Sequence, residues 1–308
     1  MAEAAGKKMP AIQIKGLTKI FKLGKEKVYA LNGIDLEIQE SEIICLLGTS
    51  GSGKSTLLNM MAGLEKPTKG SITIFGERVD KMSEKKLANF RQKYMGFVFQ
   101  SYNLLPNLTA IDNVSLPLAF AGERRKVRTA KAKKMLKLCG LGKRMRHKPT
   151  QMSGGQQQRV GIARAFVGTP KIVFADEPTG NLDTKTTIEI MEMMVRMSRE
   201  NRQTLVIVTH DIEIAGYADR IYHIIDGKIS SVEDNCGRQV LPGDTGASPP
   251  DNSPQELDLR QGAEEVAETR IIAGEEAKEL IEPIKIRSET EKAEEEISDI
   301  LRNSQLPN

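Results

Sequence analysis

The stretch that decides the fold is residues 48–56, GTSGSGKST, which directly follows the apolar run EIICLL of residues 42–47. It satisfies the pattern G-x-x-x-x-G-K-[ST], in which glycines let backbone amides wrap around phosphate oxygens. The apolar run predicts a buried strand, and residues 54–62 predict a helix whose N-terminus adds a favourable dipole. Strand, turn and helix together predict a site for a nucleoside triphosphate.

The pattern assigns a role to each part of this turn. Lys54 is predicted to reach the β- and γ-phosphates, and the Ser55 hydroxyl is predicted to bind Mg²⁺. A glycine-rich turn without a ligand is the alternative, and the flanking strand and helix disfavour it. The other predicted phosphate-binding residues are Gly48, Thr49, Ser50, Gly51, Ser52, Gly53 and Thr56.

Polar residues also end three other strand-like runs. The run VFADEP carries Asp176, a predicted Mg²⁺ ligand, and Glu177, a predicted base for the attacking water. His210 follows TLVIVT and is predicted to contact the γ-phosphate, because ligands gather at this edge of a parallel sheet. Gln100 follows GFVF and is predicted to reach both Mg²⁺ and the attacking water. The alternatives are structural: adjacent carboxylates can merely end a strand, and a single histidine is more often structural than catalytic.

Strand-like and helix-like segments alternate through the first 230 or so residues, which predicts an α/β fold with a mainly parallel sheet covered by helices. Residues 11–15 and 34–38 alternate in polarity and predict half-exposed strands of an N-terminal antiparallel part. An inserted helical subdomain is predicted at about 100–160, and a closing hairpin at 223–234. The expected organisation is a flexible N-terminus (1–10), one ATPase domain (11–234), a linker (235–255) and an acidic, partly helical tail (256–308).

The composition limits the classes of protein to which this chain can belong. With 39% hydrophobic and 28% charged residues, the chain is expected to be globular, and no run approaches the ~18 apolar residues of a membrane span. The N-terminus lacks the apolar core of a secretory signal, and Cys45, Cys139 and Cys236 lack metal-ligand spacing, as expected of a reduced, cytosolic protein.

Charge is unevenly distributed. Residues 229–308 hold 19 acidic and 8 basic side chains, whereas residues 123–148 form a strongly basic run. This run has few aromatic residues, so a solvated helical face is favoured over nucleic-acid binding; proximity to anionic lipid headgroups is a further alternative.

A second glycine turn, MSGGQQQRV at residues 152–160, also looks suited to an anion. Together with GTSGSGKST, Gln100, VFADEP, GNLD (180–183) and THD (209–211), it resembles, over residues 11–232, the ATPase subunits of ABC transporters, which have a P-loop NTPase fold. The resemblance implies Mg²⁺ and ATP, with the nucleotide between two head-to-tail subunits. The turn of one subunit then closes over the γ-phosphate held by the other. The residues implied in that contact are Ser153, Gly154, Gly155 and Gln156.

The resemblance also implies an aromatic residue that stacks on adenine, for which Phe21 is the first candidate and Tyr29 the second, with core packing as the alternative. Asp183 is implied in communication between the two sites. Met152 and Thr49 depart from the usual residues, but neither change removes a functional group.

The sequences of these motifs are most similar to those of the ATPases of lipoprotein-releasing and macrolide- or peptide-exporting systems. That branch implies a separate membrane permease, a second copy or paralogous ATPase as dimer partner, and a position on the cytoplasmic face of the membrane. A cell-division or antibiotic-sensing role is one alternative. An ABC ATPase acting on DNA or the ribosome is disfavoured, because only about a hundred residues separate Lys54 from Ser153 and the chain has one phosphate-binding turn.

Overall fold

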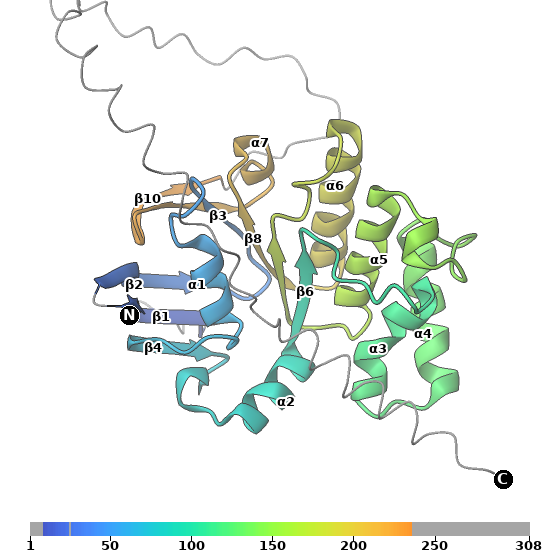
Figure 1. Ribbon diagram of the computed structural model, residues 1–308, viewed down its shortest axis with the longest axis horizontal. Coiled ribbons are helices and arrows are strands. Elements are labelled where there is room, and N and C mark those ends of the chain that lie inside the picture. The colour runs from blue at the N-terminus through green and yellow to red at the C-terminus, as the bar shows by residue number, and fades with distance from the viewer. Residues whose placement is uncertain (1–8, 25, 236–308) are drawn as a thin grey trace, which may run out of the picture. The chain divides into compact units, whose positions relative to one another are not determined.

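A computed structural model describes residues 9–24 and 26–235 (Figure 1). The predicted acidic tail lies outside the described residues, as do the predicted linker after residue 235 and most of the predicted flexible N-terminus. Among residues 9–24 and 26–235, no helix has both the length and the apolar character needed to cross a membrane.

The centre of the fold is a six-stranded sheet in the order β10-β9-β3-β8-β7-β6. Neighbouring strands from β9 to β6 are parallel, and β10 pairs with β9 in the antiparallel sense, which confirms the predicted mainly parallel sheet with a closing hairpin. The strands are β3 (Ile43–Leu47), β6 (Met95–Phe99), β7 (Ile172–Asp176), β8 (Thr204–Thr209), β9 (Arg220–Ile225) and β10 (Lys228–Asp234).

A second, antiparallel sheet has the order β2-β1-β4-β5. Its strands are β1 (Ile12–Leu23), β2 (Glu26–Ile38), β4 (Lys69–Ile74) and β5 (Glu77–Arg78). The strands predicted at 11–15 and 34–38 are therefore parts of much longer ones. Most of the remaining length of β1 and β2 is half-buried or exposed and interrupted by bulges, so no alternation of polarity marks it in the sequence.

Helices follow the strands, as the alternating pattern predicts. The block predicted to be helical contains α3, α4 and α5, which lie together to one side of the sheet in Figure 1. The helices are α1 (Lys54–Met61), α2 (Glu84–Tyr94), α3 (Ala110–Phe120), α4 (Arg125–Leu138), α5 (Gly154–Phe166), α6 (Thr184–Glu200) and α7 (Ile212–Ala215), with short 3₁₀ turns at Val79–Lys81 and Pro149–Gln151.

Two hydrophobic cores lie on opposite faces of the six-stranded sheet. In β3, Ile44 and Leu46 face the core that contains α1, whereas Cys45 and Leu47 face the core that contains α5 and α6. Successive side chains of a strand point to opposite faces, so a fully buried strand such as β3 must be covered on both sides. Helices α1 and α5 therefore cover opposite faces, as Figure 1 shows.

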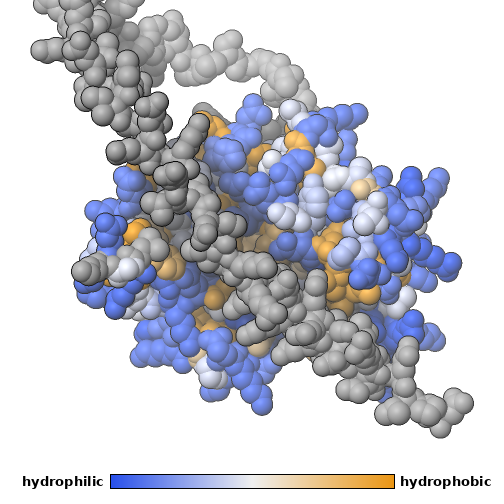
Figure 2. All heavy atoms as spheres, in the orientation of Figure 1, coloured by the Kyte–Doolittle hydropathy of each residue, from blue (hydrophilic) through white to orange (hydrophobic). Residues whose placement is uncertain are grey.

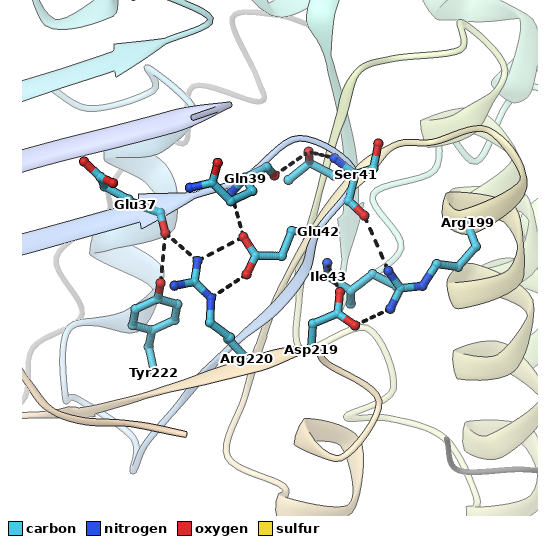
Figure 3. Close-up of polar contacts among 10 residues, drawn as sticks. Glu37, Gln39, Ser41, Glu42, Ile43, Arg199, Asp219, Arg220 and Tyr222 are labelled. Carbon is cyan, nitrogen blue, oxygen red and sulfur yellow. Dashed lines mark hydrogen bonds and ion pairs between the residues drawn. The ribbon is translucent and has the colours of Figure 1, made fainter. Parts of the chain in front are cut away.

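Polar contacts join the two sheets at the amino ends of β3 and β9 (Figure 3). The Arg220 guanidinium forms a bidentate ion pair with Glu42 and donates a hydrogen bond of 2.7 Å to the backbone oxygen of Glu37 in β2. Tyr222 donates to the same oxygen at 2.9 Å. The Glu42 carboxylate raises the pKa of Arg220, and burial raises the pKa of Tyr222 to about 12. This network ties the antiparallel sheet to the parallel one.

Replacing Glu42 with alanine is expected to lower the free energy of unfolding by about 2 kcal/mol, because it leaves the half-buried guanidinium of Arg220 without its counter-charge. Urea denaturation of the whole chain measures the change. Glu40→Ala, at an exposed position two residues earlier, is the matched control and is expected to change stability by less than about 0.5 kcal/mol. Equal effects of the two variants would show that the ion pair between Arg220 and Glu42 does not contribute to stability.

Candidate active site

The register of the parallel strands brings the predicted catalytic residues to one edge of the sheet. Leu47 of β3 lies beside Thr209 of β8, and Asp176 of β7 lies between Val208 and Phe99. The residues that follow these strand ends therefore emerge at the same edge, where open α/β sheets bind ligands. They are Gly48, His210, Glu177 and Gln100.

The turn at 48–53 requires glycine at two positions for reasons of space. A Cβ on Gly48 would lie 2.3 Å from the backbone oxygen of Ile224, and a Cβ on Gly53 would lie 2.4 Å from that of Ala30. Gly53 also has φ 101°, a backbone conformation that other residues rarely adopt. The backbone can thus curl tightly ahead of α1, as a phosphate-binding turn must.

Lys54 begins α1 and is only 5% exposed. Its Nζ donates a hydrogen bond of 2.7 Å to the Thr49 oxygen and so spans the turn. Burial lowers the pKa of Lys54, and the nearby carboxylates of Glu177 and Asp176 oppose that shift. The ammonium group is therefore held inside the turn, where a phosphate oxygen would gain most from it.

Ser55 and Asp176 form the second half of the site. The Ser55 hydroxyl donates to Asp176 Oδ1 at 3.2 Å. Burial raises the pKa of Asp176, and Glu177 adds to that effect, while Ser55 and Lys54 lower it. A hydroxyl and a carboxylate are hard oxygen donors of the kind that suits Mg²⁺, which keeps waters and phosphate oxygens as its other ligands. Among residues 9–24 and 26–235, no three or more His, Cys, Asp or Glu side chains are grouped so that they could hold a metal ion.

Glu177 lies at the sheet edge in a strained conformation. Its φ is 43°, which for a non-glycine residue costs about 1–3 kcal/mol, and its backbone N–H bonds the Val208 oxygen at 2.9 Å. Its Oε1 lies 3.2 Å from His210 Nδ1. Both side chains line two cavities, one of about 700 Å³ against residues 47–50 and one of about 240 Å³ against residues 179–187. The pair is thus accessible to a nucleotide and to water.

Gln100 follows β6 and contacts the segment after Glu177. Asn181 Nδ2 donates to the Gln100 backbone oxygen at 3.2 Å, and a Cβ on Gly180 would lie 2.8 Å from Gln100 Nε2. The structure thus places Gln100 beside the GNLD segment, which ends in Asp183. Asp183 caps the N-terminus of α6: its carboxylate accepts from Thr186 N at 3.0 Å and from Thr186 Oγ1 at 2.7 Å, and these bonds lower its pKa.

The second glycine turn begins α5. Ser153 caps the helix by accepting from the Gln156 backbone N–H, and the Gln156 side chain accepts from Ser153 N at 3.2 Å. This capping box accounts for Gln156 as well as for Ser153. A Cβ on Gly154 would lie 2.8 Å from the Tyr102 hydroxyl, and one on Gly155 would lie 2.8 Å from Thr186 Cγ2.

The structure does not bring the two glycine turns together. In the part of the chain that is described, no hydrogen bond joins residues 153–156 to residues 48–56, and the helices that follow the two turns cover opposite faces of the sheet. Each turn therefore presents its backbone amides to a different part of the surface.

Two exposed aromatic residues lie on the β1–β2 hairpin. Phe21 pairs with Val28 and Tyr29 with Ile20. These are adjacent cross-strand pairs, and adjacent pairs point to opposite faces. Phe21 and Tyr29 therefore cannot both contact the same base. Lys19 Nζ lies 5.0 Å from the centre of the Phe21 ring.

One buried polar residue near the site is absent from the predictions. Gln158 of α5 has no exposed surface, and its side chain donates to the backbone oxygen of Pro178, the residue after Glu177. A signal was present, because helical spacing places Gln158 on the same face as the buried Ile162 and Ala165.

Comparisons with known proteins agree on one family. A family model of ABC transporters matches residues 31–180. The chain is 47% identical to the lipoprotein-releasing system ATP-binding protein LolD of Geobacter metallireducens, over 71% of this chain and 97% of that one. It is 45% identical to the macrolide export ATP-binding/permease protein MacB of Rhodopirellula baltica, over 71% of this chain and 32% of that one.

A solved structure is also similar. The ATP-binding cassette MJ0796 of Methanocaldococcus jannaschii, in a dimeric post-hydrolysis state bound to ADP and Pi, superimposes with a TM-score of 0.69. It is 42% identical in sequence, and the match covers 73% of this chain and 98% of that one.

Proposed function

The chain belongs to the ATP-binding proteins of ABC transporters, and we propose that two copies, or this chain and a paralogue, bind Mg²⁺-ATP between them and hydrolyse it to drive a membrane permease. The observation that carries this proposal is the placement of the two glycine turns on helices that cover opposite faces of one sheet. A nucleotide on residues 48–56 can then meet a Ser-Gly-Gly-Gln turn only from another subunit. The dimeric state of MJ0796 with ADP and Pi supports this arrangement.

Different residues of the chain have different roles in hydrolysis. Lys54 and the backbone amides of residues 48–53 hold the phosphates and neutralise their charge. Glu177 accepts the proton of the attacking water, and His210, 3.2 Å from its carboxylate, orients that carboxylate and reaches the γ-phosphate.

Ser55, Asp176 and Gln100 would hold Mg²⁺, which neutralises charge developing on the β- and γ-phosphates. In the partner subunit, the turn at 153–156 supplies a hydroxyl and backbone amides at a helix N-terminus. Loss of the γ-phosphate removes this bridge, so hydrolysis releases the dimer. Asp183 links the two sites: it caps α6 and accepts from Thr186, whose Cγ2 lies beside Gly155 of the 153–156 turn of its own chain.

The permease fits a groove between α2, α3 and α5. This cavity of about 650 Å³ is lined by apolar side chains that include Phe97, Leu116 and Phe120, and Phe120 is 63% exposed. The MacB relative is named as an ATP-binding/permease protein, and this chain matches only 32% of its length. We assign the groove to a segment of a permease of the lipoprotein-releasing or export type, which places the chain at the inner face of the membrane.

Affinity purification from detergent-solubilised membranes, with mass spectrometry, tests the proposal. A permease with membrane-spanning helices should accompany the tagged wild-type chain and be lost with Phe120→Asp. Val232→Asp, at a 50% exposed apolar residue of β10, is the matched control and should retain the permease. Recovery of ribosomal or DNA-bound proteins instead would overturn the transport assignment.

Adenine stacking is expected on Phe21 rather than Tyr29. Phe21→Ala should raise the Kd for ATP about tenfold, because stacking between a base and an aromatic ring contributes roughly 1–3 kcal/mol. Tyr29→Ala, the matched control on the opposite face of the hairpin, should change Kd by less than about twofold. Fluorescence titration with ATP measures both, and the reverse pattern would place adenine on Tyr29.

A further inference from the structure

The most uneven charge distribution in the chain lies on and after α4. Residues 124–148 contain 12 lysines and arginines and no acidic residue, and the next carboxylate after Glu123 is Asp176. Eleven of the 12 basic residues are exposed. Of these 12, only Lys131 forms an ion pair within the described part of the chain, with Glu123. The active site uses none of them.

The orientation of α4 concentrates this charge. Ala132 and Leu136 are buried against the core, so the opposite side of the helix faces solvent. Lys126, Lys133 and Lys137 follow one another at spacings of seven and four residues on this exposed side, with Lys134 beside them. These four lysines are the basic face. Figure 2 shows hydrophilic residues along the lower right edge of the molecule, where α4 lies in Figure 1.

Exposed apolar side chains border the basic face. Val127 is 46% exposed and Leu138 is 56% exposed, and both continue the outward side of α4. Phe120, at the end of α3, precedes α4 by a short turn and also lines the groove assigned to the permease. Lysines with interspersed apolar residues on one exposed helix side are typical of contact with a membrane surface.

We propose that the basic face of α4 binds anionic phospholipid headgroups at the surface of the bilayer. Charge complementarity favours this partner, because a cluster of lysines gains most next to a dense layer of negative headgroups. The basic face lies next to the groove assigned to the permease, which places it at the membrane. This position rests on the proposed function, whereas the charge and the exposure of the lysines are observed independently of it. Nucleic acid fits less well, because α4 carries no Phe, Tyr or Trp on which a base could stack, and the neighbouring Phe120 lines the groove assigned to the permease.

Binding of the full-length protein to lipid vesicles tests the proposal. The wild-type chain is expected to cosediment with vesicles of phosphatidylcholine and phosphatidylglycerol, to bind pure phosphatidylcholine vesicles far less, and to dissociate as salt rises. The triple variant Lys126→Gln/Lys133→Gln/Lys137→Gln should lower the partition coefficient roughly a hundredfold, the change that three basic residues near an anionic surface produce.

The matched control removes the same charge elsewhere. Lys15→Gln/Lys69→Gln/Lys81→Gln changes three exposed lysines outside the helical subdomain and should leave vesicle binding within about twofold of wild type. Both triple variants should hydrolyse ATP normally, so loss of lipid binding is distinguishable from failure of the ATPase.

Three outcomes would overturn the lipid assignment. One is equal loss of binding in the two triple variants, and another is equal binding of the wild type to neutral and anionic vesicles. The third is tight binding of duplex DNA or RNA at physiological salt without vesicle binding, which would assign the basic face to nucleic acid.

Discussion

Replacing Glu177 with glutamine is expected to lower kcat for ATP hydrolysis about a thousandfold, the usual contribution of a general base. Glutamine keeps the size of the side chain but cannot accept the proton of the attacking water. Binding of ATP should persist, because Lys54, Ser55 and the backbone amides of the turn are unchanged. The variant should therefore accumulate an ATP-dependent dimer, detectable by size-exclusion chromatography, while phosphate release measures the rate.

Glu213→Gln is the matched control for this experiment. Glu213 is exposed and lines the same cavity of about 240 Å³ as Glu177, but it belongs to α7 and, among the described residues, forms no hydrogen bond or ion pair with His210. Its replacement should leave kcat within about twofold of wild type. Normal turnover by Glu177→Gln would mean that another group acts as the base, and His210 would be the next residue to replace.

Replacing Lys54 with alanine is expected to raise the Kd for ATP at least about a hundredfold, because truncating one side of a desolvated charge pair costs about 2–5 kcal/mol. The ammonium is buried within the turn and, among the described residues, donates a hydrogen bond only to the Thr49 oxygen, so its charge is available to a ligand in the turn. Isothermal titration with ATP measures the loss.

Two further variants separate binding from folding. Lys54→Met keeps most of the apolar stem and should lose ATP affinity as alanine does, while its thermal unfolding midpoint stays near wild type. Lys81→Ala, at an exposed lysine far along the chain, should bind ATP normally. Retained micromolar affinity in both Lys54 variants would refute the assignment of residues 48–56 as the phosphate-binding turn.

The parallel sheet was predictable because its strands are buried on both faces. β3, β7 and β8 read as short apolar runs ending in polar residues, and the carboxyl ends of parallel strands meet at one edge. That reasoning alone was enough to group Glu177 with His210 before the structure placed them 3.2 Å apart. The antiparallel hairpin of β1 and β2 was less predictable. Its exposed half has few buried side chains, so its sequence shows no alternation of apolar and polar residues.

Around the active site, too, some features were predictable from the sequence and others were not. The left-handed backbone of Glu177 was not predictable, because glutamate carries no preference for φ 43°; in this conformation its backbone N–H donates to the Val208 oxygen of the neighbouring strand. The capping box of Ser153 and Gln156 was readable from the S-x-x-Q spacing, and the structure shows both of its hydrogen bonds. Of the three successive glutamines 156–158, helical geometry buries only Gln158, which was not among the residues predicted from the sequence.

The sequence by itself determined the chemistry of this protein: a glycine-rich turn with Lys54, a carboxylate pair at the end of an apolar strand, and a second turn with Ser153. These are local patterns, and each specifies its own backbone and its own polar groups. Only the tertiary structure decided that the two turns lie on helices covering opposite faces of one sheet. The physical reason is the alternation of side chains along β3, which divides the interior into two cores, with α1 on one and α5 on the other.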